Sequence, residues 1–390
     1  MSHETIDVAV VGLGFGQDFI PIYREHPRVG RVGLVDTAPE RLRAVGERFG
    51  ITDRFDSLEV LLATDEWDAV HLLSPVSHHA PQTLAVLESG RHCACAVPMA
   101  TELDDLQAII EARQRHGTRY MMMETAVYAD EFHLVEQLYR DGELGQLTSY
   151  RGFHVQNLDG YPPYWRGFPP MKYATHALTP LLALTDSAVA HVATLGSGRL
   201  TADRVGAYDN PFPTQVGLFR LADSPVVADV TLSFFQTARP YVEGFDVFGD
   251  RGGIEWPRHE GDGMAYHQLQ PLEDDLPEVG LRGRRATTRT VRPPSHEGTL
   301  PEPLRRFRSE FTVESGQGET LTVKAEHGGS HPHLVHEFVS SIVEDREPWI
   351  GAVRAATWTA PGICAHESSL RDGERLQVPA YQSSTDHTAR

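Results

Sequence analysis

Three closely spaced glycines follow the first apolar run of the chain, in the sequence "GLGFGQ". Gly12 permits a tight turn after a strand, Gly14 lets the backbone approach a pyrophosphate, and N–H groups at the start of a following helix complete the anion site. Gln17 departs from the common pattern, in which a third small residue is usual. A tight turn without a ligand is the alternative explanation. We predict a dinucleotide site at Gly12, Leu13, Gly14, Phe15 and Gly16.

Asp36 ends the second apolar run, about twenty residues after the glycines. A carboxylate at the end of this strand can accept hydrogen bonds from the ribose hydroxyls of NAD. The same carboxylate would repel the 2′-phosphate of NADP. The spacing therefore favours NAD over NADP as the cofactor.

Short apolar runs alternate with helical patterns through the first third of the chain. Strands are predicted at residues 6–11, 31–36, 68–75, 91–97 and 118–125, and helices at 18–27, 38–50, 79–90 and 102–117. Strands that alternate with helices of about 10–15 residues are typical of a parallel sheet covered on both faces. We predict an α/β fold for residues 1–125, an N-terminal Rossmann domain with a doubly wound parallel sheet.

Residues 126–380 lack this alternation. Several strand patterns and one helical pattern, "THALTPLLALT", predict an α+β domain with a mostly antiparallel sheet, packed on helices at one face and on a partner subunit at the other. Residues 258–330 are rich in Gly, Pro, Arg and Glu, which predicts a long, partly mobile excursion. Residues 381–390 are predicted to be a frayed tail.

The composition limits the classes of function. A chain of 390 residues with 40% hydrophobic and 23% charged residues is typical of a globular protein of two domains. Its formal net charge of −19 argues against nucleic acid or an anionic membrane as a partner. No apolar run reaches the roughly 18 residues of a membrane-spanning helix, and an apolar strand begins at Ile6, so we expect a cytoplasmic protein. Three cysteines imply no disulfide framework.

Two groups of residues raise the question of a metal. Cys93 and Cys95, in "RHCACAVPMA", have no second ligand pair and are best explained as packed residues on one face of a strand. His331 and His333 are ill spaced for one helical face. We therefore predict no metal site, and we interpret the second group as a polar loop capped by Ser330.

The sequence "PPMKYATHALTP" places Lys172 four residues before His176. Residues at i and i+4 share a helix face, so both side chains could point into one pocket. Imidazole titrates near neutral pH and suits general acid–base catalysis. A histidine at a helix start can also do no more than satisfy a backbone carbonyl, and the pattern leaves both explanations open.

Several motifs, by their order and spacing, make the chain resemble the Gfo/Idh/MocA oxidoreductase family, named after glucose-fructose oxidoreductase, inositol 2-dehydrogenase and rhizopine catabolism. They span nearly the whole chain and read "VVGLGFG", "DAVHLLSPVSHHA", "VLESGRHC", "DGELGQLTSYR" and "GICAHESSLRDGE". The resemblance implies hydride transfer between NAD and a secondary hydroxyl of a sugar, cyclitol or glycoside, while a base takes the hydroxyl proton. It also implies a homodimer or homotetramer formed through the sheets.

The resemblance places further residues near the cofactor. Ser74, Pro75 and His79 stand in the family's turn and histidine motif after a strand. The family commonly has Glu-Lys-Pro after the fourth strand, whereas this chain reads "AVP", with Val97 and Pro98 at the last two positions. The lysine that helps to hold and polarise the substrate oxygen is therefore missing.

The acid–base motif of the family, Asp-x-x-x-His, is also altered, since Lys172 takes the place of the acid before His176. We hypothesise that Lys172 partly replaces the lost ammonium. The NAD-dependent glycosidases of family 109 are similar to this chain in "KYATH" and "AVP", which implies Tyr173 and His176 as the acid–base pair. In that alternative, NAD is reduced and reoxidised in each turnover. A second alternative is a regulator that binds NAD without turnover, as the yeast galactose repressor does.

An aromatic, proline-rich loop, "DGYPPYWRGFPP", precedes these residues. Aromatic rings suit the apolar C–H face of a sugar, although a loop packed for its own sake would have the same composition. Glu124 and Tyr128 stand where the family has residues beside the nicotinamide. We predict a carbohydrate-like substrate bound by Tyr128, Tyr161, Tyr164, Trp165 and His327.

Overall fold

The computed structural model describes residues 5–259, 261–270, 285–314, 320–323 and 327–382. The chain divides into two compact units. Unit 1 consists of Met1–Ala129, His296–Ile363 and Pro379–Arg390, and unit 2 consists of Asp130–Ser295 and Cys364–Val378. Within the described ranges, no helix is both long and apolar enough to cross a membrane.

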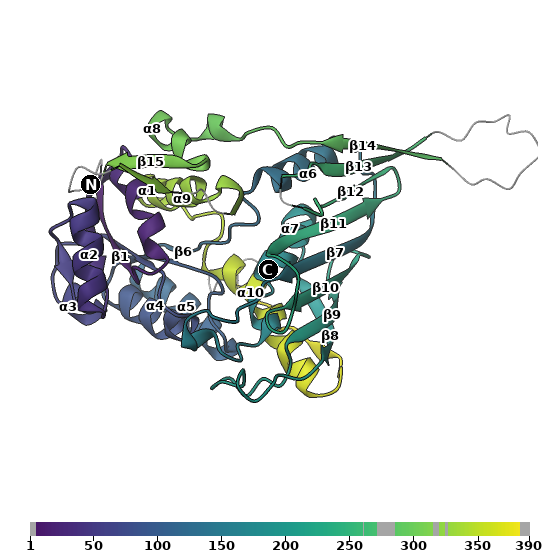
Figure 1. Ribbon diagram of the computed structural model, residues 1–390, viewed down its shortest axis with the longest axis horizontal. Coiled ribbons are helices and arrows are strands. Elements are labelled where there is room, and N and C mark those ends of the chain that lie inside the picture. Colours follow the sequence, from purple (N-terminus) through teal and green to yellow (C-terminus); the bar gives the residue numbers. More distant parts are fainter. Residues whose placement is uncertain (1–4, 260, 271–284, 315–319, 324–326, 383–390) are drawn as a thin grey trace, which may run out of the picture. The chain divides into compact units, whose positions relative to one another are not determined.

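Unit 1 contains a six-stranded parallel sheet (Figure 1). Its strands are β1 (Ile6–Val11), β2 (Val29–Val35), β3 (Arg54–Phe55), β4 (Ala69–Leu72), β5 (His92–Cys95) and β6 (Tyr120–Met122). They lie in the order β3-β2-β1-β4-β5-β6, and every pairing is parallel. The predicted Rossmann domain is confirmed. The sequence pattern missed β3, because two residues are too few to show a periodicity.

Helices cover both faces of this sheet. They are α1 (Ile20–Glu25), α2 (Pro39–Phe49), α3 (Leu58–Leu62), α4 (His79–Glu88), α5 (Leu103–His116), α8 (Glu302–Arg305), α9 (His331–Val343) and the first part of α10 (Ala352–Leu370). α4 and α5 lie together on one side, and α1 and α9 lie on the other (Figure 1). α2 and α5 end at Gly50 and Gly117, which adopt the left-handed conformation that terminates many helices.

Residues 296–363 belong to unit 1, although they follow most of unit 2 in the sequence. The sequence analysis placed residues 296–363 in the second domain, because it divided the chain in sequence order. In the structure their apolar side chains pack in the core of unit 1. Leu334 and Phe338 of α9 lie in one buried cluster with Val8 of β1. Contacts between distant segments therefore decide the division.

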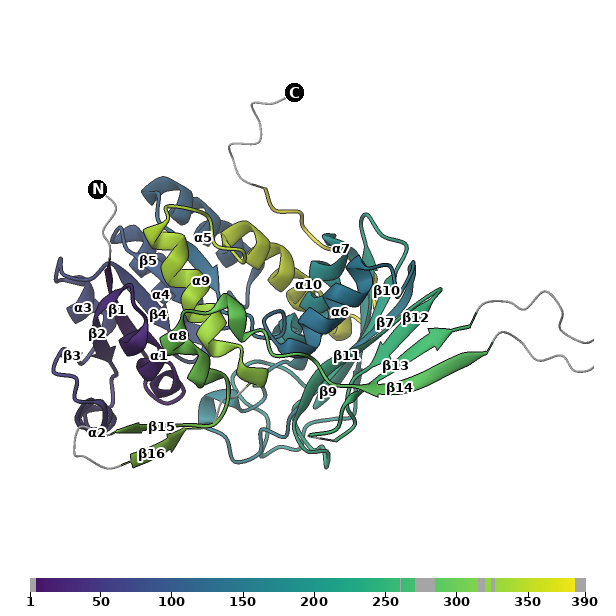
Figure 2. The same ribbon diagram turned by 90° about the horizontal axis from the view of Figure 1, so that it is seen from above.

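Unit 2 is built on a nine-stranded sheet with the order β14-β13-β12-β11-β7-β10-β9-β8-β17. Its strands are β7 (Leu147–Val155), β8 (Val189–Ser197), β9 (Thr214–Leu221), β10 (Val227–Ser233), β11 (Val242–Gly249), β12 (Gly252–Glu255), β13 (Met264–Leu269), β14 (Ala286–Val291) and β17 (Leu376–Gln377). Only β7 and β10 pair in parallel, which confirms the predicted, mostly antiparallel sheet. α7 (Thr175–Thr185) packs over β7, β10 and β11, and α6 (Asp130–Arg140) lies beside α7 (Figure 2).

The described parts of the predicted excursion, residues 258–330, contain regular structure. β13 and β14 extend the large sheet, and β15 (Phe311–Glu314) and β16 (Thr320–Val323) form a two-stranded sheet. Apolar periodicity did not indicate β14, because its side chains are largely exposed. Backbone hydrogen bonds to β13 hold this edge strand in the sheet. Residues 271–284, 315–319 and 324–326, and residues 383–390 of the predicted tail, lie outside the described part of the chain.

Candidate functional site

The glycine turn follows β1 at the carboxyl end of the parallel sheet of unit 1. Gly12 has a φ of +87°, and a Cβ atom there would lie 2.6 Å from the carbonyl oxygen of Leu73, so this position requires glycine. A Cβ atom at Gly14 would meet nothing within 4 Å, so the outer side of the turn is open to a ligand. The turn fits the pyrophosphate of a dinucleotide, which its backbone would hold.

Asp36 connects the end of β2 to the glycine turn. Its carboxylate accepts hydrogen bonds from the N–H groups of Leu13 and Ala38, both at 2.8 Å, and from the Nε and Nη2 groups of Arg41 at 2.7 and 2.8 Å. Burial acts to raise the pKa of Asp36, but the hydrogen bonds from Arg41, Ala38 and Leu13 outweigh it and leave the pKa below its usual value. The sequence argument for NAD treats Asp36 as a lone negative charge, whereas the structure pairs that charge with Arg41.

His79 joins the two loops that the resemblance places near the cofactor. Its buried imidazole has Nδ1 at 2.8 Å from the carbonyl oxygen of Pro98 and Nε2 at 3.0 Å from that of Ser74. Ser74 and Pro75 follow β4, and Val97 and Pro98 follow β5. Burial lowers the pKa of His79, although its contacts with the two carbonyl groups oppose the shift. The predicted cofactor residues of unit 1 therefore gather at the carboxyl ends of β1, β2, β4 and β5.

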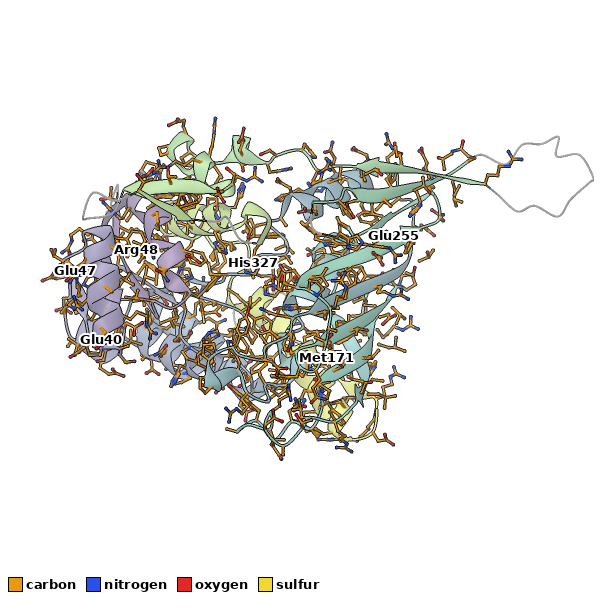
Figure 3. The ribbon with its side chains drawn as sticks, viewed as in Figure 1. Glu40, Glu47, Arg48, Met171, Glu255 and His327 are labelled. Atoms are coloured by element: carbon orange, nitrogen blue, oxygen red, sulfur yellow. The ribbon has the colours of Figure 1, made fainter. Side chains whose placement is uncertain are left out.

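His327, predicted to bind substrate, lies in the short segment before α9 (Figure 3). Its ring is 6.3 Å from the ring of Phe15, between centroids, and 5.5 Å from that of His331. His331 in turn stacks on Phe19 at 4.4 Å. The structure thus places His327 beside the glycine turn of unit 1. Ser330 occupies the position before α9, but no hydrogen bond from its side chain caps the helix.

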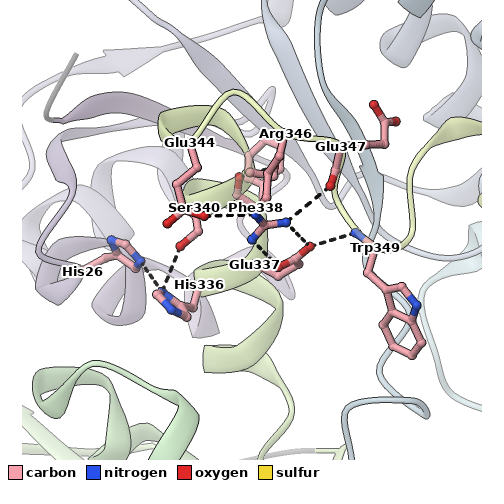
Figure 4. Close-up of polar contacts among 10 residues, drawn as sticks. His26, His336, Glu337, Phe338, Ser340, Glu344, Arg346, Glu347 and Trp349 are labelled. Atoms are coloured by element: carbon pink, nitrogen blue, oxygen red, sulfur yellow. Dashed lines mark hydrogen bonds and ion pairs between the residues drawn. The ribbon is translucent and has the colours of Figure 1, made fainter. Parts of the chain in front are cut away.

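Tyr128 is part of a polar and aromatic network in unit 1. Its ring contacts that of Trp349 at 5.5 Å. The backbone N–H of Trp349 donates to Glu337 at 2.8 Å, and Arg346 donates two hydrogen bonds to the same carboxylate (Figure 4). Burial, reinforced by the charge of Glu337, raises the pKa of Tyr128 well above its usual value. The phenol therefore stays protonated at neutral pH.

The three cysteines are buried thiols: Cys93 and Cys95 on β5, and Cys364 on α10. Burial raises the pKa of Cys95 to about 12 and that of Cys93 well above its usual value. A protonated, buried thiol is a poor nucleophile and a poor ligand. Among the residues that the structure describes, no group of three or more His, Cys, Asp or Glu side chains could hold a metal ion.

Four ionisable side chains meet in unit 2. His176 lies in the first turn of α7, Tyr173 ends the 3₁₀ turn η4 (Pro170–Tyr173), His154 lies on β7 and Glu243 lies on β11. The ring centroids of Tyr173 and His176 are 5.3 Å apart, and those of His154 and His176 are 5.6 Å apart. Glu243 Oε2 is 3.9 Å from His176 Nε2. A phenol, imidazoles and a carboxylate are groups used in general acid–base catalysis, and the 3.9 Å contact would have to shorten for direct proton transfer.

Lys172 lies next to Tyr173 in η4, whereas His176 belongs to α7. The spacing argument for a shared helix face assumes one continuous helix, which the structure divides into two segments. The positive charge of Lys172 acts on His366 of α10, because burial first and this charge second lower the pKa of His366 to about 4. His366 Nδ1 is 3.1 Å from the side-chain nitrogen of Gln215.

The aromatic loop reaches the same cluster through Trp165. The Trp165 ring lies 5.6 Å from that of Tyr173 and 5.2 Å from that of Phe168, between centroids. Tyr161 and Tyr164 are 48% and 41% exposed, so their rings are available to a ligand. The structure therefore brings Tyr173, His176 and Trp165 together within unit 2.

His154 and Glu243 were missed by the sequence analysis. His154 is buried and lies on the same face of β7 as the buried Tyr150 and Gly152. A histidine on the inward face of a predicted strand was the sequence signal that could have identified it. Glu243 is opposite His154 in the register of β7 and β11. That register joins residues 89 positions apart, and local sequence does not reveal it.

Residues 6–124 match the sequence model of the Gfo/Idh/MocA oxidoreductase family, described as an NAD-binding Rossmann fold. A glycosyl hydrolase family 109 protein of Porphyromonas gingivalis is 27% identical over 203 residues, which cover 47% of this chain and 43% of that protein. The chain thus spans less than half the length of this relative. A family 109 protein of Streptomyces coelicolor is 26% identical over 408 residues, which cover 97% of this chain and 84% of that protein.

Two solved structures show the same fold. Levoglucosan dehydrogenase, in a complex with NADH and L-sorbose, has a TM-score of 0.75 at 18% identity, with 97% of this chain and 100% of that chain covered. Myo-inositol 2-dehydrogenase from Lactobacillus plantarum has a TM-score of 0.69 at 14% identity, with 96% and 100% covered. Residues 6–124 thus match the model of the Gfo/Idh/MocA oxidoreductase family, and the chain as a whole has the fold of these two dehydrogenases.

Proposed function

We propose that the protein is an NAD-dependent oxidoreductase that transfers hydride between a secondary hydroxyl of a sugar, cyclitol or glycoside and the nicotinamide. The observation that carries this proposal is the pairing of Tyr173 with His176 in unit 2 of a chain whose unit 1 has an NAD-binding fold. Proton transfer and hydride transfer are the two halves of alcohol oxidation; Tyr173 and His176 suit the first, and bound NAD would supply the second.

NAD, when bound, supplies the hydride acceptor. In the oxidation direction, the C–H bond of the carbinol breaks with its electron pair, the O–H bond breaks with loss of a proton, and a carbonyl group forms. His176 accepts the hydroxyl proton, and Tyr173 donates a hydrogen bond to the same oxygen. Trp165, Tyr161 and Tyr164 bind the apolar face of the substrate ring.

Lys172 supplies a positive charge near the reacting oxygen in this proposal. Lys172→Ala is expected to lower kcat/KM about 10-fold or more, because a hydrogen bond from a charged group contributes about 1.5–3 kcal/mol. Steady-state kinetics with the best substrate measures the effect. Unchanged turnover and unchanged KM would rule out this role for Lys172.

The names of the structural neighbours support the substrate class. One is a dehydrogenase solved with NADH and levoglucosan, and another is a myo-inositol 2-dehydrogenase. The first is named for an anhydrosugar and the second for a cyclitol, and both rings carry secondary hydroxyl groups. NAD is the expected cofactor of this chain.

A redox glycosidase is the second candidate, favoured by the relatives named glycosyl hydrolase family 109 and by the Tyr-x-x-His spacing of Tyr173 and His176. In this reaction the sugar is oxidised, the aglycone is eliminated, water is added and the sugar is reduced again. No net NADH forms. The same two side chains would move the protons in both candidate reactions.

One assay separates the candidates. The purified protein is incubated with NAD and a panel of free sugars, cyclitols and aryl glycosides, while NADH absorbance and aglycone release are both followed. NADH formation without aglycone release supports the dehydrogenase, and aglycone release without net NADH supports the glycosidase. Tight NAD binding with neither signal would contradict both and favour a regulator.

We also propose a homodimer or homotetramer in which the outer face of the large sheet is the contact surface. Leu195, Val216 and Leu218 project from β8 and β9 and are 55%, 40% and 56% exposed. Exposed apolar side chains on adjacent strands favour contact with a second subunit. Light scattering after size exclusion tests the oligomeric state, and L218E is expected to shift it towards the monomer.

A further inference from the structure

Glu243 and His176 face one another across the buried side of the unit 2 sheet. Glu243 Oε2 lies 3.9 Å from His176 Nε2, and the two side chains are 14% and 3% exposed. We propose that Glu243 is a positioning residue that holds His176 in one tautomer, with the proton on Nε2 and Nδ1 left as the proton acceptor. This inference rests on the function proposed above.

The chemistry of the pair explains the tautomer. The contact is longer than a hydrogen bond, but a carboxylate 3.9 Å away can only accept, so its negative charge favours the tautomer with the proton on the facing nitrogen, Nε2. When Nδ1 takes the substrate proton, His176 becomes a cation, and the buried carboxylate stabilises that cation. The same logic operates where a buried acid orients a catalytic histidine in hydrolases.

The sheet fixes the pair from two adjacent strands. Glu243 on β11 is opposite His154 on β7 in the strand register, and His154 contacts both His176 and Tyr173 through its ring. The groups that face His176 include Glu243 from β11, His154 from β7 and Tyr173 from η4. Phe234 packs on His154 at 4.9 Å and adds an apolar wall.

A second pair in the same unit provides a matched control. Glu255 on β12 (labelled in Figure 3) lies 3.8 Å from Nε2 of His267 on β13, nearly the same distance as in the Glu243–His176 pair. The side chains of this pair are 37% and 26% exposed, more than those of the Glu243–His176 pair, although His267 Nε2 itself is buried. A partly exposed pair of this kind contributes little. E255Q therefore removes a carboxylate beside a histidine that is not part of the Tyr173–His176 cluster.

The experiment compares E243Q, E255Q and the unaltered full-length protein. We expect E243Q to lower kcat about 10-fold or more, with KM and the Kd for NAD within about 2-fold. The tautomer of His176 is read from two-bond nitrogen–proton correlations of protein with ¹⁵N-labelled histidine, and H176Q identifies its signals. In E243Q the Nε2-protonated signature is expected to give way to a mixture. E255Q is expected to leave both readouts unchanged.

An unchanged kcat and an unchanged tautomer in E243Q would overturn the proposal. If E243Q does not fold, the unaltered protein still tests the proposal, because a His176 protonated on Nδ1 there would overturn it. The tautomer measurement needs no substrate. If the unaltered protein oxidises nothing in the panel, the proposed function fails while the Glu243–His176 pairing is still tested.

Discussion

Buried histidines occur in both units, but their surroundings differ. In unit 1, His71 Nδ1 lies 3.1 Å from the Tyr23 hydroxyl, and both nitrogens of His79 lie within 3.0 Å of carbonyl oxygens. In unit 2, His176 contacts the rings of His154 and Tyr173, and the nearest oxygen of Glu243 is 3.9 Å away.

This difference separates histidines that support structure from those that suit chemistry. A side chain held by short hydrogen bonds within the protein is costly to disturb, and burial keeps it neutral. An imidazole among other ionisable groups at longer distances can tighten its contacts when a substrate arrives. Residue type and burial alone do not distinguish the two.

Replacement of His176 is expected to have the largest effect. H176N should lower kcat about 10²- to 10⁴-fold, because general acid–base catalysis contributes about that much. The Kd for NAD, measured by titration, should change little, since NAD is expected to bind to unit 1. H71N is the control, and it should keep kcat. If H176N retained full kcat, the assignment of unit 2 as the source of the base would be wrong.

Replacement of His79 should instead affect stability and cofactor binding. H79A removes the imidazole that lies between the carbonyl oxygens of Ser74 and Pro98. A neutral imidazole donates a hydrogen bond to one of them, and a buried polar group left without a partner costs about 1–3 kcal/mol. We expect the free energy of unfolding to fall by about 1–3 kcal/mol and the Kd for NAD to rise. The neighbouring His78 is exposed, so H78A is the matched control. Equal unfolding curves for H79A and H78A would contradict the bridging role of His79.

His71 should make the stability depend on pH. Burial lowers its pKa to about 3, so the unfolded chain binds a proton below about pH 6.5 and the folded chain does not. The contribution of neutral His71 is therefore complete above pH 6.5 and is lost as the pH falls towards 3. Linkage gives a loss of about 2 kcal/mol at pH 5.

H71N tests this dependence, because asparagine can keep the hydrogen bond to Tyr23 without titrating. Urea unfolding at pH 7.5 and pH 5 should show a smaller loss of stability for H71N than for the unaltered protein, by about 2 kcal/mol. His26, whose pKa burial lowers to about 3, contributes equally to both proteins and cancels in the comparison. An identical loss in the two proteins would mean that His71 is accessible to protons in the folded state.

Local patterns predicted the parts of the site that local sequence determines. The positions of Gly12 and Asp36 in the fold could be predicted because a strand, a turn and a helix fix them within one βαβ unit. Arg41 pairs with Asp36 through a side-chain orientation on α2, which the motif does not specify. Glu243 reaches His176 only through strand register and the packing of α7.

The same limit applies to the fold. The alternation of strands and helices predicted the parallel sheet of unit 1. The lack of this alternation in the rest of the chain predicted the mostly antiparallel sheet of unit 2. The packing of α9 on α1 joins residues more than 300 positions apart, and Phe338 looks like any apolar helix residue in the sequence. The structure places His327 near Phe15, and its contact with the substrate stays a prediction.

His327 gives the smallest effect and the sharpest test of this placement. Its ring lies edge-on to Phe15 at 85°, and such aromatic pairs contribute about 0.5–1.5 kcal/mol. H327A is expected to loosen the glycine turn and raise the Kd for NAD about 2- to 10-fold. The KM for substrate at saturating NAD should stay constant.

Y164A, a change in the aromatic loop of unit 2, should do the reverse, raising KM without changing the Kd for NAD. If H327A raised KM and left the Kd unchanged, the predicted substrate role of His327 would be supported, and proximity to Phe15 would be a poor guide to its role.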